Sequence, residues 1–141
     1  MEFAIAGEQE AVDFYSELAE KTTNAHARAN FKQFAEEERG HKRKLLAVQK
    51  GGIELKPGKK VLDLKMADYL VDVEPTKDLD YQYVLILAMK REKAAFRLYT
   101  DLAEQVNEEE IRSLFLALAQ EEAKHKLRFE IEYDDEIYAQ N

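Results

Sequence analysis

Cysteine is absent from this chain of 141 residues. Its absence excludes disulfides, thiolate nucleophiles, iron–sulfur clusters, rubredoxin-type iron sites and zinc sites that need Cys. Glycine and proline are scarce, with five and two residues. Because helix breakers are few and 35% of the residues are charged, the composition favours a folded, helix-rich protein over a disordered one. The length fits one domain that is large enough to bury a core.

Long apolar runs and an excess of positive charge are also lacking. No apolar run approaches the roughly 18 residues of a membrane-spanning helix. The first residues, Met1 to Phe3, lack the basic and long apolar regions of an export signal. The net charge is −8 and the isoelectric point about 5.0, which disfavours nucleic acid and anionic membranes and favours cations. We therefore expect a cytoplasmic protein with no nucleic-acid or membrane partner.

The first half of the chain predicts two helices. The first is expected over residues 2–22. Asn24 can cap the second, which runs to about residue 50 and stops at Gly51. The two helices form a predicted pair over residues 2–50, and the connection between them is short enough to make the pair antiparallel.

The second half predicts another helix pair, over residues 78–135. Asp78 or Asp80 can start a helix that runs to about residue 105. Asn107 can cap a helix with an acidic first turn that continues to about residue 133. The segment 51–77 between the pairs is rich in turn residues but too apolar for a free linker. We expect it to be a crossover that includes a short packed helix.

The lengths of these connections predict the fold. Two short connections make two antiparallel helix hairpins, and one long crossover joins them. This is an all-α antiparallel four-helix bundle with a single crossover, forming one domain over residues 1–141. Because helices of a bundle face a common axis, a site on that axis can take side chains from all four.

The two halves are copies of one another. A shift of 84 residues gives 13 identities across residues 8–42 without a gap, far more than chance provides. Glu8 falls on Glu92, and His41 falls on His125. An internal repeat of this kind predicts pseudo-two-fold symmetry, so that whatever lies on the bundle axis is built twice.

Acidic residues interrupt the core-facing stripe of each helix, which we call the seam. Apolar residues recur along each seam at alternating spacings of three and four, but a glutamate, or a glutamate and a histidine, stands near its middle. Buried carboxylates are costly unless they are neutralised, and no Lys or Arg lies on the seams. The six interrupting residues are Glu8, Glu38, His41, Glu92, Glu122 and His125.

Two divalent cations would balance the charge of these four glutamates. Carboxylate and imidazole ligands without thiolate suit iron or manganese. Glu-x-x-His on two helices, with one Glu on each of the other two, is the ligand pattern of di-iron bundles. A lone Glu-x-x-His is a weak signal, but two copies related by one shift are a strong one. The sequence therefore predicts a two-metal centre.

Two neighbouring glutamates compete for the ligand position in each copy. Glu37 and Glu121 precede their histidines by four residues, and Glu38 and Glu122 by three. Both spacings can share a helix face. The seam register, in which residues 34, 38, 41 and 45 follow one another, selects Glu38 and Glu122. The other two then lie at the edge of the stripe, as partners of the ligands or as surface acids.

Tyr15 and Tyr99 each follow a predicted ligand by seven residues, which is two turns along the same face. Two interpretations stay open. They are either ordinary core tyrosines or donors whose O–H groups bond a ligand carboxylate and orient it.

The motifs resemble those of the rubrerythrin branch of the ferritin-like superfamily, and the resemblance covers all four predicted helices. It implies that Glu8 and Glu92 are terminal ligands and that Glu38 and Glu122 bridge two iron ions. It also implies imidazole ligation by His41 and His125. Rubrerythrins reduce hydrogen peroxide at such centres, and related proteins oxidise Fe²⁺ with O₂ or peroxide. The segments that carry the resemblance are 6–15, 35–42, 91–99 and 119–126.

Three departures from related families stand out. Many rubrerythrins carry an extra carboxylate three residues after the third helix's ligand, where this chain has Ala95. Without cysteine there is no rubredoxin domain, so electrons must come from a separate donor, a rubredoxin-like protein or a flavoprotein. Bacterioferritins have a haem-binding Met directly after the second helix's Glu, where this chain has Arg39. We therefore expect no haem.

Three functions remain open at this stage. Open coordination positions on the metals favour an enzyme that reduces hydrogen peroxide or O₂. The alternative is a ferritin-like iron-binding protein that oxidises or stores iron. A third reading is a structural or sensor module with a redox-silent metal pair. Manganese or a mixed pair could replace iron. We also expect a homodimer, because the apolar crossover offers more surface than one short segment needs.

Overall fold

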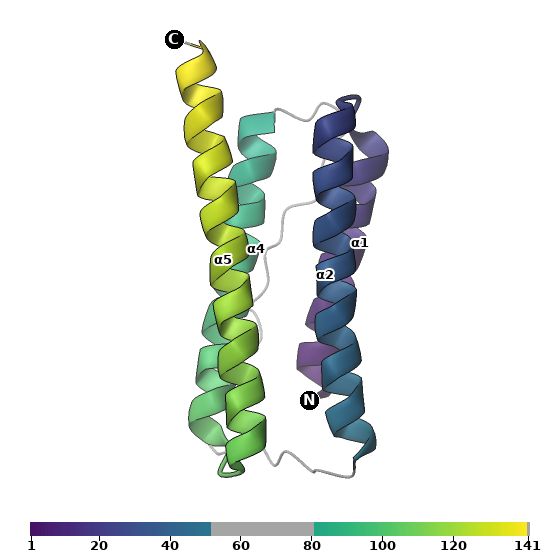
Figure 1. Cartoon of the computed structure of the whole chain (residues 1–141), viewed down its shortest axis with the longest axis vertical. Coiled ribbons are helices and arrows are strands. Elements are labelled where there is room, and N and C mark those ends of the chain that lie inside the picture. Colours follow the sequence, from purple (N-terminus) through teal and green to yellow (C-terminus); the bar gives the residue numbers. More distant parts are fainter. Residues whose placement is uncertain (52–80, 141) are drawn as a thin grey trace. The chain divides into compact units, whose positions relative to one another are not determined.

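The computed structural model describes residues 1–51 and 81–140 as four helices and contains no strand within them. Helices α1 (Glu2–Lys21) and α2 (Ala25–Lys50) form one pair, and α4 (Tyr81–Gln105) and α5 (Glu109–Gln140) form the other (Figure 1). The predicted crossover beyond Gly51 and the predicted helix starts at Asp78 and Asp80 lie outside the described residues.

The chain divides into two compact units, Met1–Leu55 and Lys56–Asn141, each holding one helix pair. In both units the two helices run antiparallel, as their short connections require (Figure 1). The predicted all-α class and the pairing of the helices are confirmed. The assignment of all residues to one domain stays a prediction.

The ends of α2 follow from its cap residues. The side chain of Asn24 accepts hydrogen bonds from the backbone N–H groups of His26 at 2.9 Å and Ala27 at 3.1 Å. These bonds satisfy two of the donors that a helix leaves without an internal partner at its start. At the other end the helix stops at Gly51, whose N–H bonds the carbonyl of Ala47 at 3.1 Å. Both predicted ends are confirmed.

An arginine at equivalent positions of the two hairpins donates a hydrogen bond to the backbone that connects the helices. Arg28 donates from Nε to the carbonyl of Ala19 at 3.3 Å and from Nη2 to the carbonyl of Thr22 at 2.9 Å. In the second unit Arg112 donates from Nη2 to the carbonyl of Val106 at 2.8 Å. The two arginines are 84 residues apart, and so are the carbonyls of Thr22 and Val106. The sequence repeat is therefore also a repeat of hydrogen bonding.

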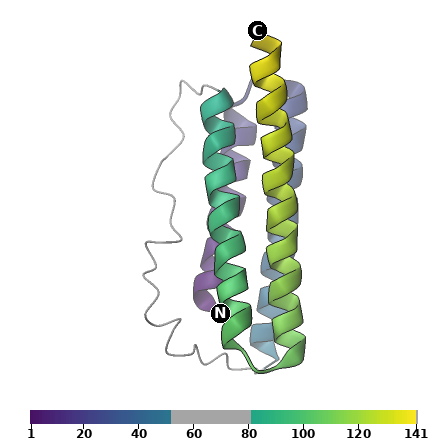
Figure 2. The same ribbon diagram turned by 90° about the vertical axis from the view of Figure 1, so that its left-hand side faces the viewer.

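Helix α5 differs from the prediction at both ends. The N–H of Arg112 bonds the carbonyl of Glu108 at 3.0 Å, which puts Glu108 rather than Asn107 in the capping position. The helix then continues to Gln140 instead of about residue 133. No glycine or proline interrupts this stretch, and near its end Tyr81 donates a hydrogen bond to Glu132. The last turns of α5 extend past the first residues of α4 (Figure 2).

The core of each unit follows the predicted seams. Tyr15 packs with Phe14 and Phe34, with ring centroids 5.2 and 5.5 Å apart. Tyr99 stacks on Phe115 at 6.1 Å. These contacts lie on the faces where the seam glutamates also sit, so the apolar packing fixes the helix faces that carry the acids. Other buried seam residues are Leu18, Phe31, Leu45, Ile111, Leu118 and Phe129.

Candidate metal centre

The first unit holds a buried cluster of two carboxylates and one imidazole. Glu8 comes from α1, and Glu38 and His41 come from successive turns of α2. Nδ1 of His41 lies 3.2 Å from Oε2 of Glu38 and 3.6 Å from Oε1 of Glu8. All three residues are at most 5% exposed, and each offers a ligand atom within 4.8 Å of the others. This spacing suits shared binding of one metal ion.

The second unit repeats the cluster. Glu92 comes from α4, and Glu122 and His125 come from α5. Nδ1 of His125 lies 3.6 Å from Oε2 of Glu92, matching the distance between His41 and Glu8. Each of the three residues is 2% exposed, and their ligand atoms also lie within 4.8 Å of one another. Each helix pair therefore brings together the three ligand candidates that the sequence assigned to it.

Burial changes the proton affinity of the first cluster. It raises the pKa of Glu8 well above the usual range, and the neighbouring Glu38 carboxyl raises it further. Burial lowers the pKa of His41, but the carboxylates of Glu38 and Glu8 outweigh it and raise this pKa to about 9. In the absence of a cation the cluster therefore holds protons at neutral pH. A divalent cation is the natural replacement for those protons.

The donor set fits a transition-metal pair by its chemistry. Each cluster offers two carboxylates and one imidazole, without thiolate, and this combination suits iron or manganese. The buried carboxylates supply the negative charge that a divalent cation would neutralise. Among the described residues these two triads are the His/Asp/Glu groups whose ligand atoms come close enough to hold an ion.

The four competing glutamates separate by burial. Glu38 is fully buried and Glu122 is 2% exposed. Glu37 and Glu121 are half-buried, and Oε1 of Glu121 lies 3.4 Å from Nζ of Lys124 at the surface. The seam register therefore agrees with the glutamates that the fold buries. Whether those two bridge the metals stays a prediction.

The two tyrosines are buried beside the same seams. Tyr15 is 0% and Tyr99 is 1% exposed.

A lysine that the sequence interpretation did not single out as functional also lies near the first cluster. Nζ of Lys42 donates to Oε1 of Gln9 at 2.6 Å, joining the helix turn after His41 to the residue after Glu8. The sequence did contain a signal for this lysine, because Lys42 is matched by Lys126 in the 84-residue repeat.

Comparison with known proteins identifies the family. The rubrerythrin family model matches residues 1–133, which is nearly the whole chain. The chain belongs to the rubrerythrin family. This confirms the resemblance drawn from the four sequence motifs, and with it the ferritin-like four-helix fold class. The match covers both triads.

A solved structure supports the assignment of this rubrerythrin-family chain. A hypothetical protein from Pyrococcus furiosus is 30% identical, with a TM-score of 0.72. The similarity covers 94% of this chain and 84% of that protein. No curated protein matches the sequence. Within residues 1–51 and 81–140, none of the helices combines the length and apolar character needed to cross a membrane.

Proposed function

We propose that this rubrerythrin-family chain is a non-haem di-iron oxidoreductase that reduces hydrogen peroxide or O₂ with electrons from a separate donor. One observation carries the proposal: a buried Glu, Glu and His triad occurs twice, on equivalent helices of an 84-residue repeat. Burying four carboxylates costs free energy, and a core without a functional site would not contain them. Two bound metal ions would compensate this cost by neutralising their charge.

In this proposal the two triads act as one centre. Glu8 and Glu92 each serve as terminal ligands, and His41 and His125 supply one imidazole to each metal. Glu38 and Glu122 would be the carboxylates shared by the two metals. The donor set fits two iron ions, with manganese or a mixed pair as the nearest substitutes. Once bound, the iron pair would supply two electrons to an oxidant at its open coordination positions.

The chain's own residues would set up the site. The carboxylates would neutralise the charge of the cations. Each histidine lies 3.6 Å from a glutamate on the other helix of its pair. Tyr15 and Tyr99 are proposed to donate hydrogen bonds to ligand carboxylates and so to orient them. The apolar seam around the triads limits water, which strengthens electrostatic interactions inside the site.

The reaction requires an external reductant. Reduction of one H₂O₂ to two water molecules consumes two electrons and two protons. The chain has no cysteine and hence no thiolate-ligated redox centre of its own. In this proposal the electrons arrive from a rubredoxin-like protein or a flavoprotein, one or two at a time.

A ferroxidase of the ferritin-like type is the second candidate. The observation that favours it is Ala95, which stands where many rubrerythrins have an extra carboxylate. Without that carboxylate, the predicted ligands are six residues, with the same three residue types in each half of the repeat. In this case Fe²⁺ is the substrate, is oxidised and then leaves or is stored.

An anaerobic Fe²⁺ titration tests both. The protein is loaded with Fe²⁺, treated with H₂O₂ or O₂, and followed by absorbance with the iron content measured in parallel. Repeated turnover of peroxide at a fixed two irons per chain supports the oxidoreductase. Iron uptake well beyond two per chain supports the ferroxidase. Absence of any reaction with either oxidant contradicts both and favours a redox-silent metal pair.

We also propose that the protein is a homodimer. The residues 61–71 on which the sequence prediction rested lie outside the described residues, but the second unit offers another apolar surface. Leu116, Leu127 and Ile131 on α5 are 50 to 55% exposed, and Phe96 on α4 is 39% exposed. Large apolar side chains exposed on one helix pair commonly meet a partner, and a two-fold dimer is the commonest closed assembly.

A further inference from the structure

The outer surface of α2 is basic although the protein is acidic. This helix holds seven Lys and Arg residues against three glutamates, and one of those, Glu38, is fully buried. The whole chain carries a net charge of −8. Positive charge is therefore concentrated on one helix, and that helix also provides the predicted ligands Glu38 and His41.

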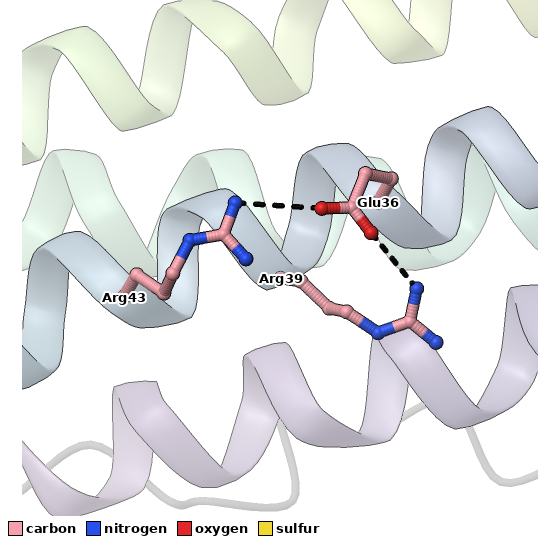
Figure 3. Close-up of polar contacts among 3 residues, drawn as sticks. All are labelled: Glu36, Arg39 and Arg43. Atoms are coloured by element: carbon pink, nitrogen blue, oxygen red, sulfur yellow. Dashed lines mark hydrogen bonds and ion pairs between the residues drawn. The ribbon is translucent and has the colours of Figure 1, made fainter.

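Three residues on this surface form an open ion-pair network. Glu36 accepts from Nη1 of Arg39 at 3.1 Å and from Nη2 of Arg43 at 3.4 Å. Figure 3 shows one carboxylate between the two guanidinium groups, each of which has further nitrogen atoms that do not contact Glu36. The side chains are 46 to 65% exposed. One negative charge is shared by two positive ones, so the network has a net positive charge and donors to spare.

A groove beside the network extends the basic surface. It has a volume of about 640 Å³ and runs between α1 and α2. Arg28, Lys32 and Arg39 line it together with the acids Glu20 and Glu36. The groove therefore presents three cations and two carboxylates, and its basic side is continuous with Arg43.

The repeat shows that the fold does not require this charge. The equivalent face of α5 is largely apolar, although the two helices occupy equivalent places in their hairpins. Leucine replaces a cation twice and alanine once. Since a charged and an apolar face are both compatible with the same hairpin, the difference points to different partners. The equivalent pairs are Lys32 and Leu116, Arg39 and Ala123, and Arg43 and Leu127.

The position of the basic face suits electron entry. Arg39 directly follows Glu38, and Arg43 lies two residues after His41. The buried ligands and the exposed arginines belong to opposite sides of one helix, whose diameter with side chains is about 10–12 Å. A redox protein seated on the arginines would be separated from His41 by little more than that helix.

We propose that the basic face of α2, formed by Lys32, Arg39 and Arg43 with the adjoining groove, is the docking site for an acidic one-electron carrier protein. The proposal rests on the proposed function, because only a reductase needs such a donor. Two reduced carriers dock in turn and each loses one electron. One H₂O₂ takes up those two electrons and two protons from solvent, its O–O bond breaks, and two water molecules form. Charge complementarity makes an acidic carrier the fitting partner.

The test uses the iron-loaded protein and a rubredoxin of net negative charge. The variant Arg39→Ala/Arg43→Leu puts the α5 residues at the equivalent α2 positions, and Arg39→Glu/Arg43→Glu reverses the charge. The matched control, Lys93→Glu/Arg97→Glu, makes the same charge change at two exposed positions of α4, the first of which directly follows the predicted ligand Glu92. Binding of zinc-substituted rubredoxin is measured by calorimetry at low and high salt, alongside donor-dependent peroxide turnover.

We expect the charge reversal to weaken rubredoxin binding at low salt by about tenfold or more and to lower kcat/KM for the donor similarly, with a smaller loss in the Ala/Leu variant. Salt should weaken wild-type binding, weaken binding of the Ala/Leu variant less, and leave unchanged or improve binding of the charge-reversal variant, where it screens repulsion. Single-turnover oxidation of the Fe²⁺-loaded protein by H₂O₂ needs no donor and should be unchanged. Unaltered binding in the α2 variants, or an equal loss in the α4 control, would overturn the docking site. Failure of the single turnover in the wild type would instead contradict the proposed function.

Discussion

Nδ1 of His41 lies 3.2 Å from Oε2 of Glu38, one turn earlier on α2, and both side chains are buried. Because the two groups are in contact, the protonation of the imidazole depends on the charge of the carboxylate. Without a metal, a proton on the imidazole offsets the carboxylate charge. With a metal, both groups must be deprotonated to act as ligands. As pH rises, the stability of the metal-free protein should therefore fall while its affinity for metal should increase.

The metal-free protein should lose stability as pH rises from about 6.5 to 9. The folded-state pKa of His41 is about 9, against 6.5 in the unfolded chain. In this window the folded state holds a proton that the unfolded state has lost, so the free energy of unfolding falls with rising pH. The raised pKa of Glu8 acts with the same sign from lower pH. Thermal melts of chelator-treated protein should show it. A loss of about 1 kcal/mol corresponds to about 3 °C in Tm.

Two controls accompany the melts. His41→Gln should flatten the fall above pH 6.5, because the titrating imidazole is gone. Mn²⁺ should reverse the trend in the wild type, because its ligands bind more strongly once deprotonated. A metal-free Tm that rises steadily from pH 5 to 8 would contradict a buried, proton-holding cluster.

Substitution of the predicted ligands should separate bridging from terminal positions. Glu38→Ala and Glu122→Ala should each abolish the metal pair, because a bridging carboxylate contacts both ions. Glu8→Ala and Glu92→Ala should weaken mainly one site. Metal content per chain after Mn²⁺ or anaerobic Fe²⁺ loading checks this, with two metals expected in the wild type.

The half-buried neighbour Glu37 provides the control for the ligand variants. Glu37→Ala removes an equal charge from the same turn of α2 and should keep two metals per chain. If Glu38→Ala binds two metals with wild-type affinity while Glu37→Ala loses them, the ligand assignment within the pair is wrong.

The sequence predicted all three residues that the structure brings together in each triad, but less of their surroundings. Glu38 could be chosen over Glu37 because the seam register is a property of the helix period, and the structure buries Glu38. The start of α5 could not be fixed, because Asn107 and Glu108 are adjacent polar residues and both can precede a helix. The network of Glu36 with Arg39 and Arg43 was also missed, because exposed charges on one helix carry no periodic signal for a partner.

Helix capping gives a stability prediction in which the two hairpins differ. Asn24→Ala removes a side chain that accepts two backbone hydrogen bonds, so it should lower the free energy of unfolding by about 1 kcal/mol. Asn107→Ala should change it by less than about 0.5 kcal/mol, because Glu108 occupies the capping position of α5. Urea unfolding of both variants at one pH provides the comparison. Equal losses in the two would contradict the revised start of α5.

Self-association should depend on the exposed apolar face of α5. The variant Leu116→Lys/Leu127→Arg places on α5 the residues that the repeat has at equivalent positions of α2, Lys32 and Arg43. Both leucines are at least half exposed, so the helix should fold unchanged while a dimer that buries them loses apolar contact area and gains unpaired charge. Light scattering coupled to size exclusion should show a dimer for the wild type and a mass near the 16.4 kDa of one chain for the variant. Arg43→Leu, which adds an apolar residue to α2, should leave the wild-type mass unchanged. A wild-type mass of a single chain removes the dimer, and a variant that stays dimeric moves the interface away from α5.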